Sequence, residues 1–233
     1  MKTLVAPVAT VAALTLLSPT AARADTRHVT LGGVNVTLRP HTSQVVTVDR
    51  TKGYHAHLGF WTLQDGRWRR AYDVRDGRIG YGGLARPRHR VQGSGTTPLG
   101  TVRLITAFGR HARNDSWDLP YRRIQRGDYW VEDNRSPYYN RYRNKSQGGF
   151  RWWLSSRSVN SSERLLDFPR QYEFSIVTGY NYAAQVRHRG AGIFLHVNGR
   201  GATAGCVSAP RWFLSRMMSR LDPAQVPVMA VGR

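Results

Sequence analysis

The sequence predicts a mostly β domain of the sandwich or barrel type with a few short helices. Three features of the 233-residue chain lead to this expectation. Short runs of alternating apolar and polar residues recur along it, glycine and aspartate separate these runs, and only one stretch has the helical period of about 3.6 residues. With 40% hydrophobic and 11% aromatic residues, the chain has the composition of a packed globular protein.

The first predicted strands lie in the N-terminal half of the chain. Residues 45–48 form a β-branched run, and residues 57–63 form a second strand that is followed by a turn at Gln64-Asp65-Gly66. Residues 68–74 are expected to be the hairpin partner of that strand, ending at Arg75-Asp76-Gly77. The glycines at 77, 80, 82 and 83 predict tight turns or a close approach of two backbones.

The C-terminal half supplies the remaining elements. Residues 101–106 alternate like a half-buried strand, and residues 172–177, 191–197 and 226–231 are further strand candidates. Residues 210–221 are the clearest helix, because Pro210 suits a first turn. One apolar face is expected on that helix, formed by Trp212, Phe213, Met217 and Leu221.

The first 24 residues have the pattern of a cleaved secretory signal peptide. Lys2 supplies a positive charge, residues 4–17 are apolar, and Ala22-Arg23-Ala24 matches a cleavage site. We therefore expect three parts: a signal peptide (1–24), an N-terminal arm (25–42) and one domain (43–233). No later segment is apolar and long enough to span a membrane, so the mature protein is expected outside the cytoplasmic membrane.

The chain is strongly basic, with 35 Lys and Arg against 14 Asp and Glu. Nearly all of the basic residues are arginine, whose planar guanidinium suits carboxylates and phosphates. An intracellular protein of this charge would be expected to bind nucleic acid. Because the signal peptide predicts export, we expect no nucleic-acid partner, and anionic cell-wall polymers or peptide carboxylates are the fitting partners.

Cys206 is the only cysteine, so it cannot form an internal disulfide. It is either an inert buried residue or a thiol kept for its reactivity. His196 lies ten residues upstream across a glycine-rich connection. A histidine near a thiol can activate it as a nucleophile, either as an ion pair or by taking its proton during attack.

The chain resembles the YkuD-type L,D-transpeptidases, bacterial enzymes that cross-link peptidoglycan. Their pattern of a strand-end histidine, a glycine-rich stretch and Ser/Thr-x-Gly-Cys is matched by His196, Thr203, Gly205 and Cys206. Upstream, residues 95–102, 107–109 and 179–181 resemble further blocks of the family in the same order. The chain departs from many members at Ala204, where they have histidine, and at Ser208, where they have arginine.

The resemblance implies a YkuD-like β-sandwich or barrel and a set of site residues. Cys206 would be the nucleophile and His196 its base, acting on peptidoglycan stem peptides through a thioester. Gly205, Thr203, Ser208 and Tyr180 would stabilise the oxyanion or bind substrate. A backbone carbonyl would orient the histidine. We expect a monomer without cofactor or metal, since His55 and His57 lack an evident third ligand.

Two alternatives to cross-linking stay open. An L,D-carboxypeptidase or amidase would differ only in using water to resolve the thioester. A non-catalytic basic module that binds the cell wall would neither form a thioester nor resolve one.

The segment 117–153 is rich in aromatic residues and arginine. It is interpreted either as a wall or lid of a substrate groove or as an insertion that packs on itself. Four acidic residues in it are expected to pair with its arginines: Asp118, Asp128, Glu132 and Asp133.

Overall fold

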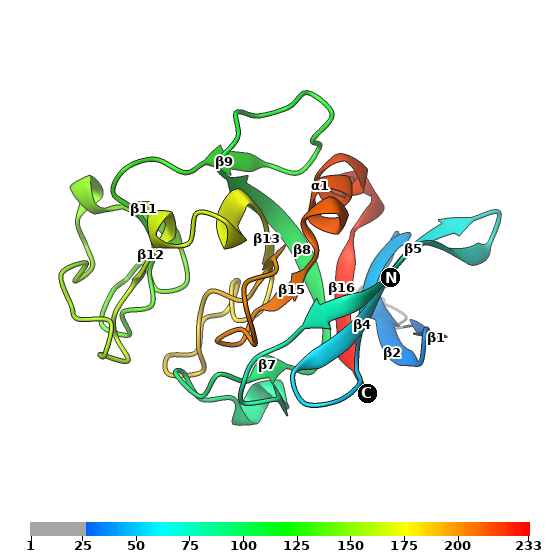
Figure 1. Cartoon of the computed structure of the whole chain (residues 1–233), viewed down its shortest axis with the longest axis horizontal. Helices are drawn as coiled ribbons and strands as arrows, with labels where there is room; N and C mark the ends of the chain where they lie inside the picture. The colour runs from blue at the N-terminus through cyan, green and yellow to red at the C-terminus, as the bar shows by residue number, and fades with distance from the viewer. Residues whose placement is uncertain (1–26) are drawn as a thin grey trace, which may run out of the picture.

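A closed β-barrel forms the centre of the protein (Figure 1). The computed structural model describes residues 27–233, so the expected signal peptide lies outside the described residues. Nine strands are paired in the order β13-β14-β15-β5-β4-β3-β16-β8-β9, and β13 also pairs with β8. This second pairing closes the sheet and confirms the mostly β architecture predicted from the sequence.

The barrel strands are β3 (Gln44–Arg50), β4 (His55–Gln64), β5 (Arg67–Arg78), β8 (Gly100–Gly109), β9 (Tyr121–Arg123), β13 (Phe174–Thr178), β14 (Phe194–Val197), β15 (Val207–Ala209) and β16 (Val228–Gly232). Smaller sheets contain β1 (Arg27–Leu31), β2 (Val34–Leu38), β6 (Leu84–Ala85), β7 (Thr97–Pro98), β10 (Asp128–Trp130), β11 (Tyr142–Asn144) and β12 (Glu163–Arg164). The helices are α1 (Arg211–Arg220) and the short 3₁₀ turns η1 (Pro87–His89), η2 (Lys145–Gln147), η3 (Leu165–Asp167), η4 (Gln171–Glu173) and η5 (Pro223–Gln225).

The hairpin β4–β5 forms where the sequence predicts it. Asp65 and Gly66 both have positive φ angles, 50° and 72°, as a two-residue hairpin turn requires. The second strand is longer than expected, because β5 continues through Gly77 to Arg78. Gly77 pairs with Ala56, and a Cβ at Gly77 would lie 2.0 Å from Cδ1 of Leu58. The glycine therefore allows close packing inside the strand instead of ending it.

Three strand predictions in the C-terminal half begin too early. The last of them, expected at residues 226–231, starts at Val228. Strand β13 begins at Phe174, because Tyr172 lies in the turn η4. Strand β14 begins only at Phe194, because Gly192 has a φ of +64° and ends the extended backbone before it. Residues that precede β13 and β14, including Tyr172 and Gly192, line a cavity described below.

Helix α1 covers one side of the barrel and buries Phe213, Leu214, Met217 and Met218. These side chains join the largest apolar cluster, together with residues of β3, β4, β8 and β13. The predicted helix is confirmed, but its expected apolar face is wrong at Trp212, which is 49% exposed. The Trp212 ring meets the edge of Tyr72 instead, with ring centroids 6.2 Å apart.

The described part of the expected N-terminal arm is a hairpin formed by strands β1 and β2. Val34 and Val36 are fully buried against Val45, Val228 and Ala230 of β3 and β16. The hairpin therefore packs on the barrel through an apolar cluster of its own.

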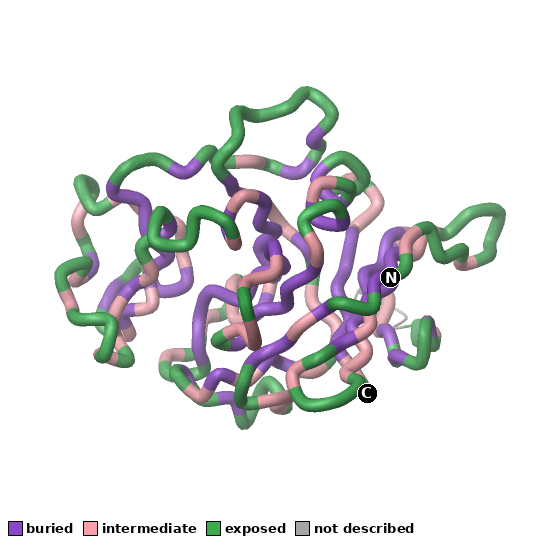
Figure 2. Tube along the Cα trace, in the orientation of Figure 1, coloured by how far each residue is buried: buried purple, intermediate pink, exposed green. Residues whose placement is uncertain are grey.

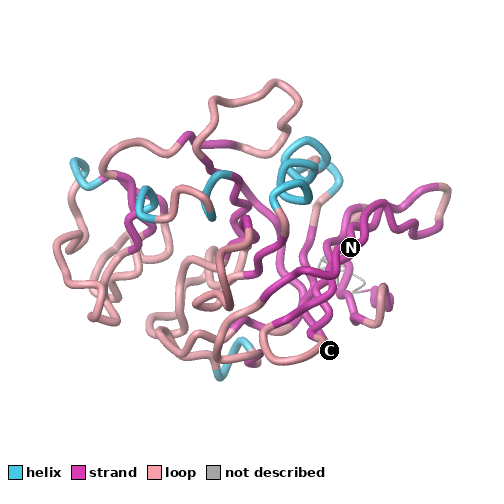
Figure 3. Tube along the Cα trace, in the orientation of Figure 1, coloured by secondary structure: helices cyan, strands magenta, loops and turns pink. Residues whose placement is uncertain are grey.

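The chain between β9 and β13 forms the part of the molecule farthest from the β4–β5 turn (Figure 1). Most of it is loop, with a small sheet in the order β11-β10-β12 (Figure 3). Burial is concentrated in the barrel strands and continues into this region (Figure 2). This second layer of loops forms one wall of the cavity beside the barrel.

Candidate active site

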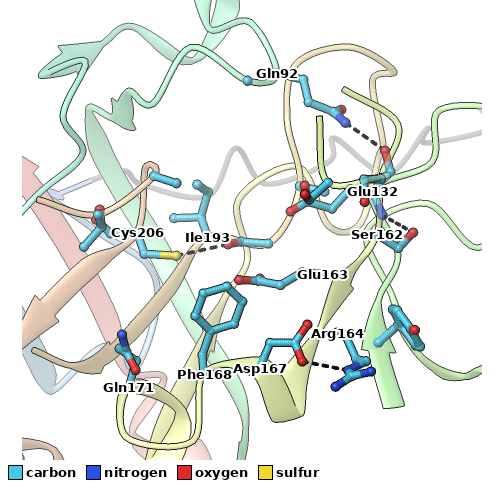
Figure 4. Close-up of a pocket in the computed structure, with 18 of the residues that line it drawn as sticks. Gln92, Glu132, Ser162, Glu163, Arg164, Asp167, Phe168, Gln171, Ile193 and Cys206 are labelled. Atoms are coloured by element: carbon cyan, nitrogen blue, oxygen red, sulfur yellow. Dashed lines mark hydrogen bonds and ion pairs between the residues drawn. The ribbon is translucent and has the colours of Figure 1, made fainter. Parts of the chain in front are cut away.

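Two adjacent parallel strands bring Cys206 and His196 to one cavity. His196 lies in β14 opposite Ser208 of β15, and Cys206 immediately precedes β15. Side chains two residues apart on a strand point to the same face, so Cys206 lies on the face that His196 shares. Both residues line a cavity of about 1000 Å³. Figure 4 shows the Cys206 sulfur pointing into this space.

The backbone fixes the tautomer of His196. Its Nδ1 lies 2.9 Å from the carbonyl oxygen of Val197. A carbonyl can only accept, so Nδ1 carries the proton and Nε2 keeps a lone pair. The ring is 7% exposed and meets Tyr172 at 88° with centroids 5.5 Å apart. Burial lowers the pKa of His196 to about 4, so the imidazole is neutral at physiological pH.

The Cys206 thiol is held by the start of β14. Its Sγ donates to the Gly192 carbonyl at 3.2 Å and accepts from the Phe194 N–H at 3.3 Å. Burial, reinforced by the nearby charge of Glu163, raises the pKa of the Cys206 thiol. Within the described residues no hydrogen bond joins Sγ to the His196 ring. Cys206 and His196 are therefore both neutral at rest. The sequence left two possibilities, a resting ion pair or proton transfer during attack, and the neutral state fits proton transfer during attack.

Threonine hydroxyls fix the backbone around the cysteine. Thr203 Oγ1 donates to the Cys206 carbonyl at 2.6 Å and accepts from the Gly205 N–H at 3.2 Å. Thr97 Oγ1 lies 3.3 Å from the same carbonyl and accepts from the Gly80 N–H at 2.8 Å. Thr203 also lines the cavity. The Gly205 N–H, expected to face an oxyanion, is thus engaged by Thr203.

Gly205 allows the chain to pass close to a neighbouring segment. Its φ is +132°, and a Cβ there would lie 2.7 Å from Nη2 of Arg90 and 2.8 Å from the Thr96 carbonyl oxygen. Only glycine adopts this conformation without strain.

The structure does not bring Ser208 and Tyr180 into the cavity. Ser208 is fully buried and donates to Asn198 Oδ1 at 2.7 Å. Tyr180 is 6% exposed and donates to the Arg189 carbonyl at 2.9 Å, with its ring facing the Arg90 guanidinium at 5.4 Å. The expected contact of these two side chains with substrate has no support from their positions.

The sequence predicts none of the charged residues that line the cavity as site residues, among them Arg90, Glu132 and Glu163. Glu132 was expected to pair with an arginine of its own segment, but within residues 27–233 its carboxyl has no ion-pair partner. Burial raises the pKa of Glu132 to about 8 and that of Glu163 to about 7, with the charge of Glu163 contributing at Glu132. Asp133 does pair, with Arg151.

The segment 117–153 combines both of its proposed roles. Tyr129 and Trp152 line the cavity. Two arginines of the segment instead lie over aromatic rings: the Arg143 guanidinium is 3.4 Å from the Tyr138 ring centroid, and that of Arg141 is 4.0 Å from the centroid of Tyr182. The segment packs on itself and on its neighbours, and its inner face is a cavity wall.

The described residues contain neither a metal-binding cluster nor a membrane-spanning helix. No group of three or more His, Cys, Asp or Glu side chains within residues 27–233 is arranged to hold a metal ion. In the same range, no helix combines the length and hydropathy of a membrane span.

Comparison with known proteins identifies the family. A model of the YkuD family, described as the L,D-transpeptidase catalytic domain, matches residues 43–228. A comparison of the sequence with curated proteins gave no significant match. The family match covers most of the chain, including the whole barrel up to the start of β16 and both Cys206 and His196. The chain therefore belongs to the YkuD family of L,D-transpeptidase catalytic domains.

Proposed function

We propose that the protein is a cysteine acyltransferase of the L,D-transpeptidase type that cross-links peptidoglycan stem peptides. The single observation that supports this proposal most is the shared cavity of Cys206 and His196. The Val197 carbonyl leaves Nε2 of His196 unprotonated, as a base for the thiol must be.

In the first step the Cys206 thiol attacks the carbonyl carbon between a diamino acid and a terminal D-amino acid. His196 takes the thiol proton as the C–S bond forms, and it gives that proton to the leaving amine as the C–N bond breaks. The products are a thioester on Cys206 and a free D-amino acid. Because both resting groups are neutral and buried, no thiolate–imidazolium pair precedes the attack, and charge develops on His196 and on the substrate oxygen as the C–S bond forms.

In the second step an amine of another stem attacks the thioester carbon. The new amide joins two stems, and the sulfur leaves as the thiol after taking back a proton. Water in place of the amine would give only a shortened stem, which is the carboxypeptidase alternative. Exported action at the cell wall fits this chemistry and rests on the expected signal peptide at residues 1–24.

The test uses disaccharide-tetrapeptide with the mature chain and its Cys206→Ala variant, followed by mass spectrometry. We expect the wild type to release the terminal D-alanine, carry a thioester adduct and form a joined dimer. The variant should do none of these. A shortened monomer without dimer would support hydrolysis, and an unchanged substrate with a folded wild-type protein would refute the acyl chemistry.

A further inference from the structure

The cavity wall facing Cys206 carries two carboxyl groups (Figure 4). Glu163 begins β12 and pairs with Trp130 of β10, and Glu132 follows β10 by two residues. In their ionised forms both carboxylates add to the effect of burial, which raises the pKa of the Cys206 thiol. The small sheet therefore presents acidic groups to the nucleophile across the cavity.

The Glu132 carboxyl is held in place without a partner of its own. Its backbone carbonyl accepts from Gln92 at 2.8 Å, and its N–H donates to Ser162 Oγ at 3.2 Å. Among the described residues, no hydrogen bond or ion pair reaches its carboxyl oxygens. Oε1 would lie 2.8 Å from a Cβ at Gly192, whose carbonyl accepts from the Cys206 thiol. Glu163 differs, because its Oε1 accepts from the Tyr172 hydroxyl at 2.7 Å.

Arg90 provides a second, independent observation. The side chain is 5% exposed and lines the same cavity. Nε donates to the Thr96 carbonyl at 2.7 Å and Nη1 to the Arg189 carbonyl at 2.9 Å. Nη2, which adjoins Gly205, makes no hydrogen bond to any residue in the described part of the chain. A cavity-lining guanidinium with one nitrogen that lacks an acceptor can bind an anionic group of a ligand.

The two groups are close enough for the charge of Arg90 to lower the pKa of Glu132, although burial has the larger, opposite effect. Arg90 lies against Gly190, and Glu132 lies against Gly192. Consecutive Cα atoms are about 3.8 Å apart, so these glycines are at most roughly 7 Å from each other. No ion pair joins the two side chains within the described range. A free carboxyl beside a free guanidinium matches a zwitterion, in which an ammonium stands next to a carboxylate.

We propose that Glu132 and Arg90 form the subsite of the acyl acceptor, Glu132 taking a proton from its ammonium and Arg90 holding the carboxylate beside that ammonium. This inference rests on the proposed function, and it specifies the acceptor as an amine of α-amino-acid type. An alkylammonium cannot attack until it loses a proton, since its ordinary pKa is about 10. His196, with a pKa of about 4, is a poor base for it, whereas Glu132, with a pKa of about 8, is a closer match.

The proton balance of the transfer step follows. Ionised Glu132 takes one proton from the ammonium and releases the neutral amine. The amine nitrogen bonds to the thioester carbon, and the C–S bond breaks. His196 takes the second proton from that nitrogen and returns it to the sulfur of Cys206. Glu132 gives its proton to solvent when the product leaves, so both residues regain their starting states.

The first arm of the test compares the wild type with Glu132→Gln, which keeps the shape of the side chain. Under saturating tetrapeptide donor, we expect unchanged release of D-alanine and an unchanged thioester adduct. The ratio of dimer to hydrolysed monomer should fall about 100-fold, the usual effect of removing a general base. Asp73→Asn is the matched control, because Asp73 is a partly exposed carboxylate outside the cavity, paired with Arg70. Its ratio should match the wild type.

The second arm varies the acceptor in the wild type. A stem whose side-chain amine stands beside a carboxylate should be joined at least tenfold faster than the same stem with that carboxylate amidated, or than a lysine stem. Arg90→Lys should weaken this preference, and thermal unfolding shows whether the variant folds. If the Arg90→Lys variant does not fold, the comparison of acceptors in the wild type still tests whether the site prefers an amine beside a carboxylate.

Each outcome has one meaning. An unchanged dimer ratio in the Glu132→Gln variant overturns its role, and equal rates for free and amidated acceptors overturn that of Arg90. Both results leave the proposed function intact. Failure of the wild type to release D-alanine refutes the proposed function itself, and the acceptor subsite with it.

Discussion

Because His196 is buried and neutral, the free energy of unfolding depends on pH, and one substitution measures the share due to this residue. His196→Asn removes the titrating group while an amide N–H can still reach the Val197 carbonyl. Burial lowers the pKa of His196 from 6.5 to about 4. As pH falls below 6.5, the unfolded chain binds a proton at this residue before the folded chain does. The contribution of His196 is therefore fully present above pH 6.5 and is lost as the pH falls towards 4.

The pKa difference sets the size of the effect. It corresponds to about 3 kcal/mol at roughly 1.4 kcal/mol per pH unit. The pKa values of Glu132 and Glu163 are raised, so these residues change the stability with pH in the opposite direction to His196. Their contribution to stability is lost as the pH rises from 4.5, the pKa in the unfolded chain, towards 7 to 8. Both carboxyls are present in the wild type and in the variant. Their contribution cancels when the two free energies of unfolding are subtracted.

Urea unfolding followed by tryptophan fluorescence at pH 4, 5, 6 and 7 measures this difference. We expect the stability of the wild type relative to the His196→Asn variant to fall by about 3 kcal/mol between pH 7 and pH 4. A difference that stays constant within about 0.5 kcal/mol over this range would show that His196 titrates alike in both states. The account of a buried, neutral base would then be wrong.

Three further predictions concern the cysteine loop. Because the pKa of Cys206 is raised, iodoacetamide should label the resting protein more slowly than glutathione at neutral pH, and a faster rate would indicate a resting thiolate. Gly205→Ala should abolish thioester formation and lower the melting temperature, whereas Gly201→Ala, where a Cβ meets nothing within 4 Å, should leave both unchanged. Thr97→Val removes the hydrogen-bond acceptor of the buried Gly80 N–H. Differential scanning calorimetry should therefore show that the free energy of unfolding falls by about 2 kcal/mol. A decrease below about 0.5 kcal/mol would contradict this hydrogen bond.

The elements with strong local signals could be predicted from the sequence. The Asp65-Gly66 turn depends on two adjacent residues that accept positive φ, and it defines the hairpin β4–β5. Helix α1 has its periodicity within ten residues. Its buried face was misplaced at Trp212, because the helix meets the barrel along Phe213, Leu214 and Met217. The direction from which the barrel approaches is set by distant strands.

The candidate site likewise contains residues that could be predicted from the sequence and residues that could not. Cys206 and His196 are ten residues apart and carry a motif, so the sequence pointed to both. Arg90, Glu132 and Glu163 have no local pattern that separates them from the other charged residues of a basic chain. They meet because β10 pairs with β12 and because the loop before β7 packs on residues 189–192. Such pairings across long stretches of chain cannot be inferred from spacing.

The place of β16 within the barrel links synthesis to assembly. This strand, residues 228–232, lies between β3 and β8, in parallel with the first and antiparallel to the second (Figure 1). A growing chain that lacks it has two open strand edges, which can pair with other chains. The barrel that holds β14 and β15 closes only once β16 has been made. The last barrel strand in the chain is thus the one that completes the ring of strands.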